Sequence, residues 1–214
     1  MILIRHGQTE FNRVYSETGR DPGIRDPQLT AVGRSQAAAV AQALAAMNPS
    51  RLIVSPYTRA LETAEIIATD LGLPISVEPL IAERFAFTCD IGTPLAMLQA
   101  RWLDIAFDHL PDPWWPAREE TVGALSRRSE LFCSRIAREA WSRIAVITHW
   151  GFIRAVTGLK VPNGAALRID PTRPDRRAEP LFLPGTRRTP VTGDPYGGRY
   201  DRQRCRRRTN DEPF

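Results

Sequence analysis

Short runs of apolar residues alternate with longer amphipathic segments along the first 170 residues of the chain. Short buried strands are predicted over residues 1–6, 51–55, 74–77 and 144–148, each built on one of these apolar runs. Strands that are apolar throughout, rather than at alternate positions, are typical of parallel sheets covered on both faces. The pattern therefore predicts a doubly wound, three-layer α/β/α fold, with a mostly parallel sheet between two layers of helices.

The segments between the predicted strands carry helix signals. Helices are predicted over residues 29–46, 58–71, 119–140 and 151–159. The first begins near Thr30, a suitable N-cap, and the second ends before Gly72, which suits the position that follows a helix. Residues 7–28, by contrast, are polar and rich in turn-forming residues.

Two segments depart from this alternation. Residues 84–118 mix tryptophan and phenylalanine with proline, and we expect a lid-like insertion that covers the site, helical over about residues 94–105. The composition changes again at Pro171, because residues 171–214 hold seven prolines and four glycines but few aliphatic side chains. Such a segment cannot bury enough apolar surface to fold alone. The sequence thus predicts one domain over residues 1–170 and a disordered or irregular tail.

The excess positive charge of the chain belongs to that tail. The formal net charge is +5, and residues 171–214 hold 11 arginines against 6 acidic residues, which accounts for all of it. Residues 1–170 hold 18 basic and 18 acidic residues and are neutral overall. The charge therefore gives no support to nucleic-acid binding by the folded domain, and such contact is expected only through the basic tail.

Other classes of protein receive no support from the sequence. No run of 18 apolar residues is present, so no transmembrane helix is expected. The chain opens directly on a predicted core strand, which argues against a signal peptide. Its three cysteines have neither metal-site nor disulfide-framework spacing, so we expect a cytoplasmic protein.

Three of the predicted strands end in residues that can carry chemistry. Arg5 and His6 follow the first strand, Arg59 follows the second, and His149 follows the fourth. The carboxyl ends of strands are where open α/β sheets bind their ligands. Arginine offers a planar fork of donors that suits phosphate, and a neutral imidazole can act as a nucleophile. The pattern predicts a nucleophile set beside a cradle for a dianion.

These residues lie in motifs that resemble the histidine phosphatase superfamily, in its phosphoglycerate mutase-like, Arg-His-Gly phosphatase branch. Four motifs carry the resemblance, in the family's order: Arg5-His6-Gly7-Gln8-Thr9-Glu10-Phe11-Asn12, Leu29-Thr30-Ala31-Val32-Gly33, Ser55-Pro56-Tyr57-Thr58-Arg59-Ala60 and Thr148-His149-Trp150-Gly151. Glu120-Thr121 followed by Arg127 resembles the family more loosely. The resemblance spans about residues 1–170.

The resemblance implies a role for each site residue. His6 is expected to be the nucleophile that forms a phosphohistidine, with its other ring nitrogen held by an acceptor such as a backbone carbonyl. Arg5, Asn12, Arg59 and His149 are expected to bind the phosphoryl group, His149 as a cationic donor.

The leaving alkoxide also needs a proton, so a carboxylic acid is required opposite the nucleophile. The family carries this acid in a Leu-x-Glu context after the third strand. Here Leu80-Ile81-Ala82-Glu83 offers Glu83, one residue looser than that pattern, as general acid and base. Asp90 is the alternative, because it lies in an acidic turn that precedes Gly92.

The resulting expectation is a phosphoric monoester hydrolase that needs no metal or other cofactor and acts on a small phosphorylated substrate. Sugar phosphates, nucleotides, a cobalamin precursor and phosphoproteins all fit, and the pattern assigns no oligomeric state. A phosphoglycerate mutase and a catalytically silent binding module are the alternatives. Residues 84–118 lack the paired-arginine, proline-rich stretch expected of a mutase, which favours the phosphatase. Trp150 stands where the family commonly has a small residue, next to His149, so it is a candidate specificity determinant together with residues 84–118.

Overall fold

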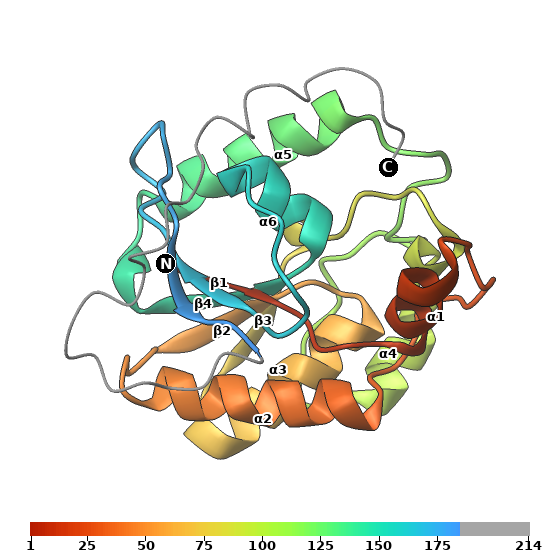
Figure 1. Ribbon diagram of the computed structural model, residues 1–214, viewed down its shortest axis with the longest axis horizontal. Coiled ribbons are helices and arrows are strands. Elements are labelled where there is room, and N and C mark those ends of the chain that lie inside the picture. The colour runs from red at the N-terminus through yellow and green to blue at the C-terminus, as the bar shows by residue number, and fades with distance from the viewer. Residues whose placement is uncertain (185–214) are drawn as a thin grey trace. The chain divides into compact units, whose positions relative to one another are not determined.

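In the computed structural model, which describes residues 1–184, a single six-stranded sheet forms the middle layer (Figure 1). The strands are β1 (Ile2–Arg5), β2 (Arg51–Val54), β3 (Ile75–Val77), β4 (Ile144–Thr148), β5 (Ala166–Arg168) and β6 (Glu179–Phe182). Their order in the sheet is β3-β2-β4-β1-β5-β6. β1 to β4 are parallel and β5 is antiparallel to both of its neighbours, so the mostly parallel sheet is confirmed.

Helices cover both faces of the sheet (Figure 1). They are α1 (Glu10–Thr18), α2 (Ala31–Ala45), α3 (Thr58–Leu71), α4 (Leu95–Arg101), α5 (Val122–Ile136) and α6 (Trp150–Thr157). Short 3-10 helices lie at Pro79–Ile81, Thr88–Asp90 and Trp141–Arg143. α2 and α3 pack together on one side of the sheet, and α5 and α6 pack together on the other.

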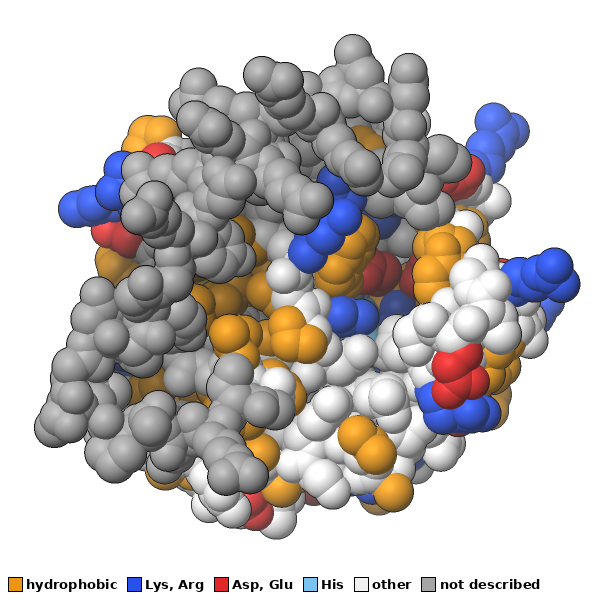
Figure 2. All heavy atoms as spheres, viewed as in Figure 1, with side chains coloured by type: hydrophobic (Ala, Val, Ile, Leu, Met, Phe, Trp, Pro, Cys, Tyr) orange, Lys and Arg blue, Asp and Glu red, His pale blue; other side chains and the backbone are white. Residues whose placement is uncertain are grey.

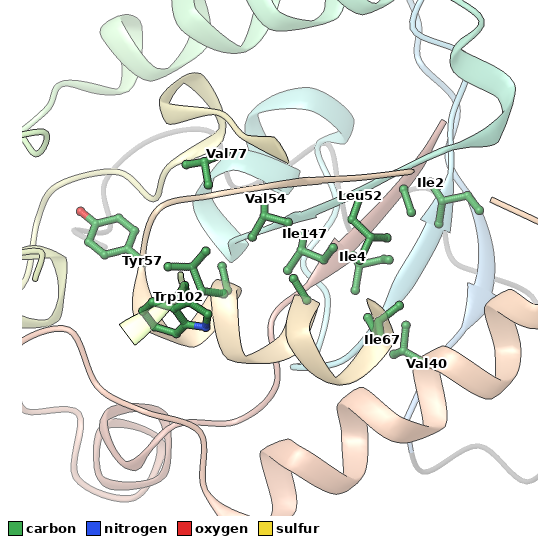
Figure 3. Close-up of a cluster of buried hydrophobic side chains, with 14 of the residues drawn as sticks. Ile2, Ile4, Val40, Leu52, Val54, Tyr57, Ile67, Val77, Trp102 and Ile147 are labelled. Atoms are coloured by element: carbon green, nitrogen blue, oxygen red, sulfur yellow. The ribbon is translucent and has the colours of Figure 1, made fainter. Parts of the chain in front are cut away.

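The alternation of side chains along β1 divides the core into two clusters. Ile2 and Ile4 face the α2–α3 layer, where they belong to one cluster with Val40 and Ile67 (Figure 3). Met1 and Leu3 belong to the other cluster, with side chains from α5 and α6 such as Phe132 and Phe152. Burying one such side chain stabilises the fold by roughly 1.5–3 kcal/mol. This two-sided burial explains why Ile2, Leu3 and Ile4 are apolar in succession.

The polar segment over residues 7–28 contains a helix that the sequence pattern did not indicate. Thr9 caps α1 at its N-terminus, and its side chain and that of Asn12 form a reciprocal capping box. Gly19, in the left-handed conformation, ends the helix. Phe11, Val14 and Tyr15 share one face of this helix, but the apolar stripe is short and lies within a segment that is otherwise polar.

The predicted start of the irregular tail at Pro171 was wrong. β6 lies beyond that point and pairs with β5, and Leu181 and Phe182 pack against the core. Strand pairing satisfies the backbone there, which composition alone does not anticipate. The folded unit extends over Met1–Pro184. Residues 185–214, with the arginine-rich run, lie outside the described residues.

The aromatic residues of segment 84–118 mostly pack into the core. Trp102, Phe107 and Trp114 join the cluster of Figure 3. The Trp114 and Tyr57 rings pack edge to face, with their centroids 4.7 Å apart. The Trp114 indole N–H donates to the Thr93 carbonyl at 2.9 Å. The helical part, α4, is shorter than predicted. In the part of the chain that the structure describes, no helix is long and apolar enough to cross a membrane.

Candidate active site

The two motif histidines are brought together by the parallel pairing of β1 with β4. Arg5 lies opposite Thr148 in this register, so the residues that follow, His6 and His149, leave the same edge of the sheet side by side. Their ring centroids are 5.0 Å apart. Figure 2 shows basic and acidic side chains meeting in a hollow on this face of the molecule. Strand register therefore assembles residues that lie far apart in the sequence.

The His6 imidazole is buried and oriented by the backbone. Its Nδ1 lies 2.7 Å from the Gly7 carbonyl oxygen, which can only accept, so Nδ1 carries the proton and Nε2 keeps its lone pair. Burial, followed by the charges of Arg59 and Arg5, holds the pKa of His6 well below its usual 6.5. The ring is therefore neutral at neutral pH, with a basic nitrogen available.

Arg59 is 3% exposed, and each of its three guanidinium nitrogens donates one hydrogen bond to a neighbouring residue. Its guanidinium donates to the Cys89 carbonyl at 2.7 Å and to the Asp90 carboxylate at 3.0 Å. It also stacks on the Tyr57 ring, 4.2 Å from the ring centroid. Burial alone would lower its pKa, but the neighbouring Cys89, Asp90 and Asp26 side chains raise it overall. The positive charge is thus held firmly in one orientation.

Arg5 differs from Arg59, because no carboxylate of residues 1–184 forms an ion pair with it. Nη1 donates to the Val161 carbonyl at 2.7 Å, while Nε is buried and has no hydrogen-bond partner among the described residues. Burial lowers the pKa of the guanidinium to about 10, which still leaves it charged at neutral pH. A buried cationic donor in this setting favours an anionic ligand.

His149 is completely buried, and both of its ring nitrogens have partners. Arg59 Nε donates to Nδ1 at 3.3 Å, and Nε2 lies 2.7 Å from the Ser55 hydroxyl. Burial, followed by the charge of Arg59, holds the pKa of His149 well below 6.5. Its surroundings on their own therefore favour the neutral ring, not the cationic form that we expected.

Asn12 approaches the site from the first turn of α1. Its side-chain oxygen accepts from the Thr9 backbone N–H at 3.1 Å and from the Asn163 amide at 3.0 Å. Asn163 also donates to the His6 carbonyl at 3.2 Å. With its oxygen occupied in this way, Asn12 offers a ligand the donor NH₂ group.

The two candidate acids have different environments. Glu83 accepts from the Gly151 N–H at 3.0 and 3.2 Å and from the Arg84 N–H at 2.8 Å. Burial, followed by the charge of Asp90, raises the pKa of Glu83 above its usual 4.5. Asp90 accepts from Arg59 through one oxygen and from two backbone N–H groups of its own loop through the other. Asp90 is therefore a structural anchor, and Glu83 is the candidate proton donor.

Sequence reasoning assigned no role to several residues that build this site. Ser55 contacts His149 directly, and its position in the Ser-Pro motif was a usable signal. Asp26 is buried, accepts from the Thr58 and Thr93 hydroxyls at 2.7 Å, and lies 3.8 Å from Arg59. Only the fold brings Asp26 and Asn163 to the site. In residues 1–184, no group of three or more His, Cys, Asp or Glu side chains is arranged to hold a metal ion.

The structure shows which arginine contacts the glutamate of the loosely matched motif before β4. Glu120 pairs with Arg128 and not with Arg127, since two oxygens of Glu120 accept from Arg128 at 2.7 Å each. Arg127 is exposed.

Trp150 is partly buried and begins α6 beside His149. The guanidinium carbon of Arg154 lies 5.2 Å from the centroid of the Trp150 ring.

The comparison with known families agrees with this geometry. The sequence model of the histidine phosphatase superfamily (branch 1) matches residues 1–173. The chain belongs to this superfamily. Glucosyl-3-phosphoglycerate phosphatase of Mycolicibacterium vanbaalenii is 29% identical over 187 residues, which cover 78% of each chain. A probable phosphoglycerate mutase of Proteus mirabilis is 30% identical over 156 residues, which cover 70% of this chain and 68% of that relative.

A solved structure has the same fold. The structure of mycobacterial glucosyl-3-phosphoglycerate phosphatase complexed with VO3 superimposes with a TM-score of 0.55 at 22% identity. The match covers 84% of this chain and 96% of that one. The phosphoglycerate mutase-like fold expected from the motifs is thereby confirmed.

Proposed function

We propose that the protein is a metal-independent phosphomonoesterase that works through a phosphohistidine on His6, with Glu83 as general acid and base. The observation that carries the proposal is the 2.7 Å contact between His6 Nδ1 and the Gly7 carbonyl. This contact selects the tautomer with a free Nε2 lone pair, beside an arginine that has no anionic partner within residues 1–184. A neutral ring of this kind can attack a phosphorus atom at neutral pH.

In the first step, His6 Nε2 attacks phosphorus and the bond to the ester oxygen breaks. Arg5, Asn12, Arg59 and His149 donate to the phosphoryl oxygens, whose charge spreads as the group is transferred. Glu83 gives its proton to the departing alkoxide, and its raised pKa favours the protonated form that this step needs. A phosphoryl dianion would raise the pKa of His149, so binding of substrate and protonation of this ring are coupled.

In the second step, water attacks the phosphohistidine. Glu83, now a carboxylate, accepts a proton from the water, and the phosphorus–nitrogen bond breaks. Inorganic phosphate leaves, the neutral His6 ring is regenerated and Glu83 is again protonated, so atoms and charges balance. The same carboxyl group serves both steps because its Gly151 and Arg84 hydrogen bonds favour the carboxylate that burial disfavours.

The test is phosphate release from p-nitrophenyl phosphate in EDTA, with the native chain, His6→Ala and His109→Ala compared. His109 is exposed, which makes it the matched control. We expect EDTA-resistant turnover in the native chain and the control, and none in His6→Ala. Turnover that survives in His6→Ala would contradict the mechanism. Activity that appears only with 2,3-bisphosphoglycerate would identify a mutase, and no activity under any condition would leave a silent binding module.

The substrate is proposed from the relatives. Two of the proteins described above are named as glucosyl-3-phosphoglycerate phosphatases, so small phosphorylated compounds of the phosphoglycerate class are the first to test. Trp150 and segment 84–118 are the residues whose exchange should alter preference among substrates, since Trp150 adjoins His149.

A further inference from the structure

The segment that carries Glu83 is held by side chains and not by secondary structure. Residues 82–87 belong to no helix or strand. The backbone carbonyls of residues 80–83 nevertheless all accept hydrogen bonds from side chains. Arg128 donates to the carbonyls of Leu80, Ala82 and Glu83. The Thr148 hydroxyl donates to the Ile81 carbonyl at 2.6 Å. Unpaired backbone groups at such a position would be costly, so these donors define the conformation of the segment.

All five N–H groups of the Arg128 guanidinium donate to this segment or to Glu120. Nη1 donates to the Leu80 and Ala82 carbonyls at 2.7 and 2.8 Å, and Nη2 donates to the Glu83 carbonyl at 3.0 Å. The remaining two N–H groups bind both oxygens of Glu120 at 2.7 Å. Only a guanidinium has five donors in a rigid fork, so lysine cannot reproduce this pattern.

Glu120 fixes the other side of the same segment. Its backbone N–H donates to the Phe85 carbonyl at 2.8 Å, and its carbonyl accepts from Arg84 at 3.1 Å. The residues on both sides of Glu83 are thus tied to the start of α5. The Arg128 side chain is 17% exposed, which strengthens these bonds relative to those of a surface pair.

We infer that Arg128, with Glu120, is a positioning residue for proton transfer by Glu83. It touches neither substrate nor the reacting atoms, and it acts by fixing the backbone from which the Glu83 carboxyl reaches the leaving oxygen. The inference rests on the proposed function. It assigns the alignment of the general acid to Glu120 and to Arg128 of α5.

The test compares Arg128→Lys with Arg127→Lys, a control at the preceding position of the same helix whose side chain is exposed. Both variants and the native chain are assayed on p-nitrophenyl phosphate and on phenyl phosphate, whose leaving group is more basic and needs the proton more. We expect Arg128→Lys to lower kcat on phenyl phosphate by about tenfold or more and kcat on p-nitrophenyl phosphate by clearly less, while KM changes by less than about twofold. Arg127→Lys should leave kcat on both substrates unchanged.

The double variant with Glu83→Gln completes a double-mutant cycle. Once Glu83 cannot donate a proton, Arg128→Lys should produce no further change in the ratio of kcat on phenyl phosphate to kcat on p-nitrophenyl phosphate. Equal losses on both substrates, or a changed ratio in the Glu83→Gln background, would overturn the inference. Glu120→Gln is the second variant should Arg128→Lys fail to fold, and the same selective loss is expected from it. Failure of the proposed function would be seen separately, as turnover that does not depend on His6.

Discussion

The backbone N–H of Gly151 donates to both carboxylate oxygens of Glu83, at 3.0 and 3.2 Å. Gly151 is the second residue of α6, so this N–H is one of those that a helix leaves without an internal partner. A Cβ atom on residue 151 would lie 2.3 Å from Glu83 Oε1. The absence of a side chain at this position therefore creates the space that the carboxyl group occupies.

Gly151→Ala should displace Glu83 without unfolding the protein. The atom in conflict is the end of a flexible side chain, and alanine is a better helix former than glycine by about 1 kcal/mol. We expect kcat on phenyl phosphate to fall by about tenfold or more, with an unchanged or slightly raised melting temperature. Gly123→Ala is the matched control, since Gly123 is the second residue of α5 and its added Cβ would meet only Arg127, at 3.6 Å. A fully active Gly151→Ala variant would contradict the role given to Glu83.

Asn12→Asp should separate phosphate binding from helix capping. Aspartate keeps the oxygen that accepts from Thr9 and Asn163, and a carboxylate is favourable in the first turn of a helix. It loses the NH₂ donor and adds a negative charge near the phosphoryl position. We expect the melting temperature to stay within a few degrees while the Kd for inorganic phosphate, measured by calorimetry, rises by about tenfold or more. Unchanged phosphate affinity would remove Asn12 from the binding site.

The two arginines of the cradle should respond differently to the same substitution. Arg59→Gln leaves the buried carboxylates of Asp26 and Asp90 without their cation, and breaking a buried pair in this way costs about 3–5 kcal/mol. Arg5→Gln breaks no ion pair among the described residues and loses one bond to the Val161 carbonyl, so about 1 kcal/mol is expected. Urea unfolding measures both values.

Phosphate binding should nevertheless weaken by about tenfold or more in Arg5→Gln, because a charged donor is lost. Similar losses of stability in the two variants would show that the contrast between these two arginines is wrong. Retained phosphate affinity in Arg5→Gln would separately remove Arg5 from the cradle.

The sequence predicts best the parts of the site that follow directly from strand ends. His6, Arg59 and His149 each follow a short apolar run, and parallel strands bring such positions to one edge of the sheet. The motif glycines Gly7 and Gly33 are explained by a close contact between their backbones. A Cβ on Gly7 would lie 2.3 Å from the Gly33 carbonyl oxygen, so their backbones meet where no side chain fits.

The sequence pattern did not predict features that depend on contacts between residues far apart in the chain. β6 exists because it pairs with β5, and neither strand has a strong apolar signal of its own. Arg127 and Arg128 are neighbours in the sequence but point in directions about 100° apart on a helix, so only the packed structure selects Arg128 as the partner of Glu120. The same reasoning applies to Asp26, whose buried contacts come from residues far away in the chain.

The pH dependence of kcat/KM should be bell-shaped, with its limbs assigned to His6 and Glu83. His6 must be neutral to attack, and its pKa is lowered from 6.5, so the nucleophile is lost only as the pH falls through this lowered value. Glu83 must be protonated for the first step, and its pKa is raised from 4.5, so the acid is lost as the pH rises through this raised value. The lowered pKa of His6 therefore sets the acid limb of the profile, and the raised pKa of Glu83 sets its basic limb.

Glu83→Gln distinguishes the two limbs, because glutamine cannot ionise. The basic limb should disappear in this variant, while the acid limb stays where it was. The basic limb of the native chain should also be shallower with p-nitrophenyl phosphate than with phenyl phosphate, because a good leaving group needs the proton less. A basic limb that persists unchanged in Glu83→Gln would assign it to a different group and would remove Glu83 as the general acid.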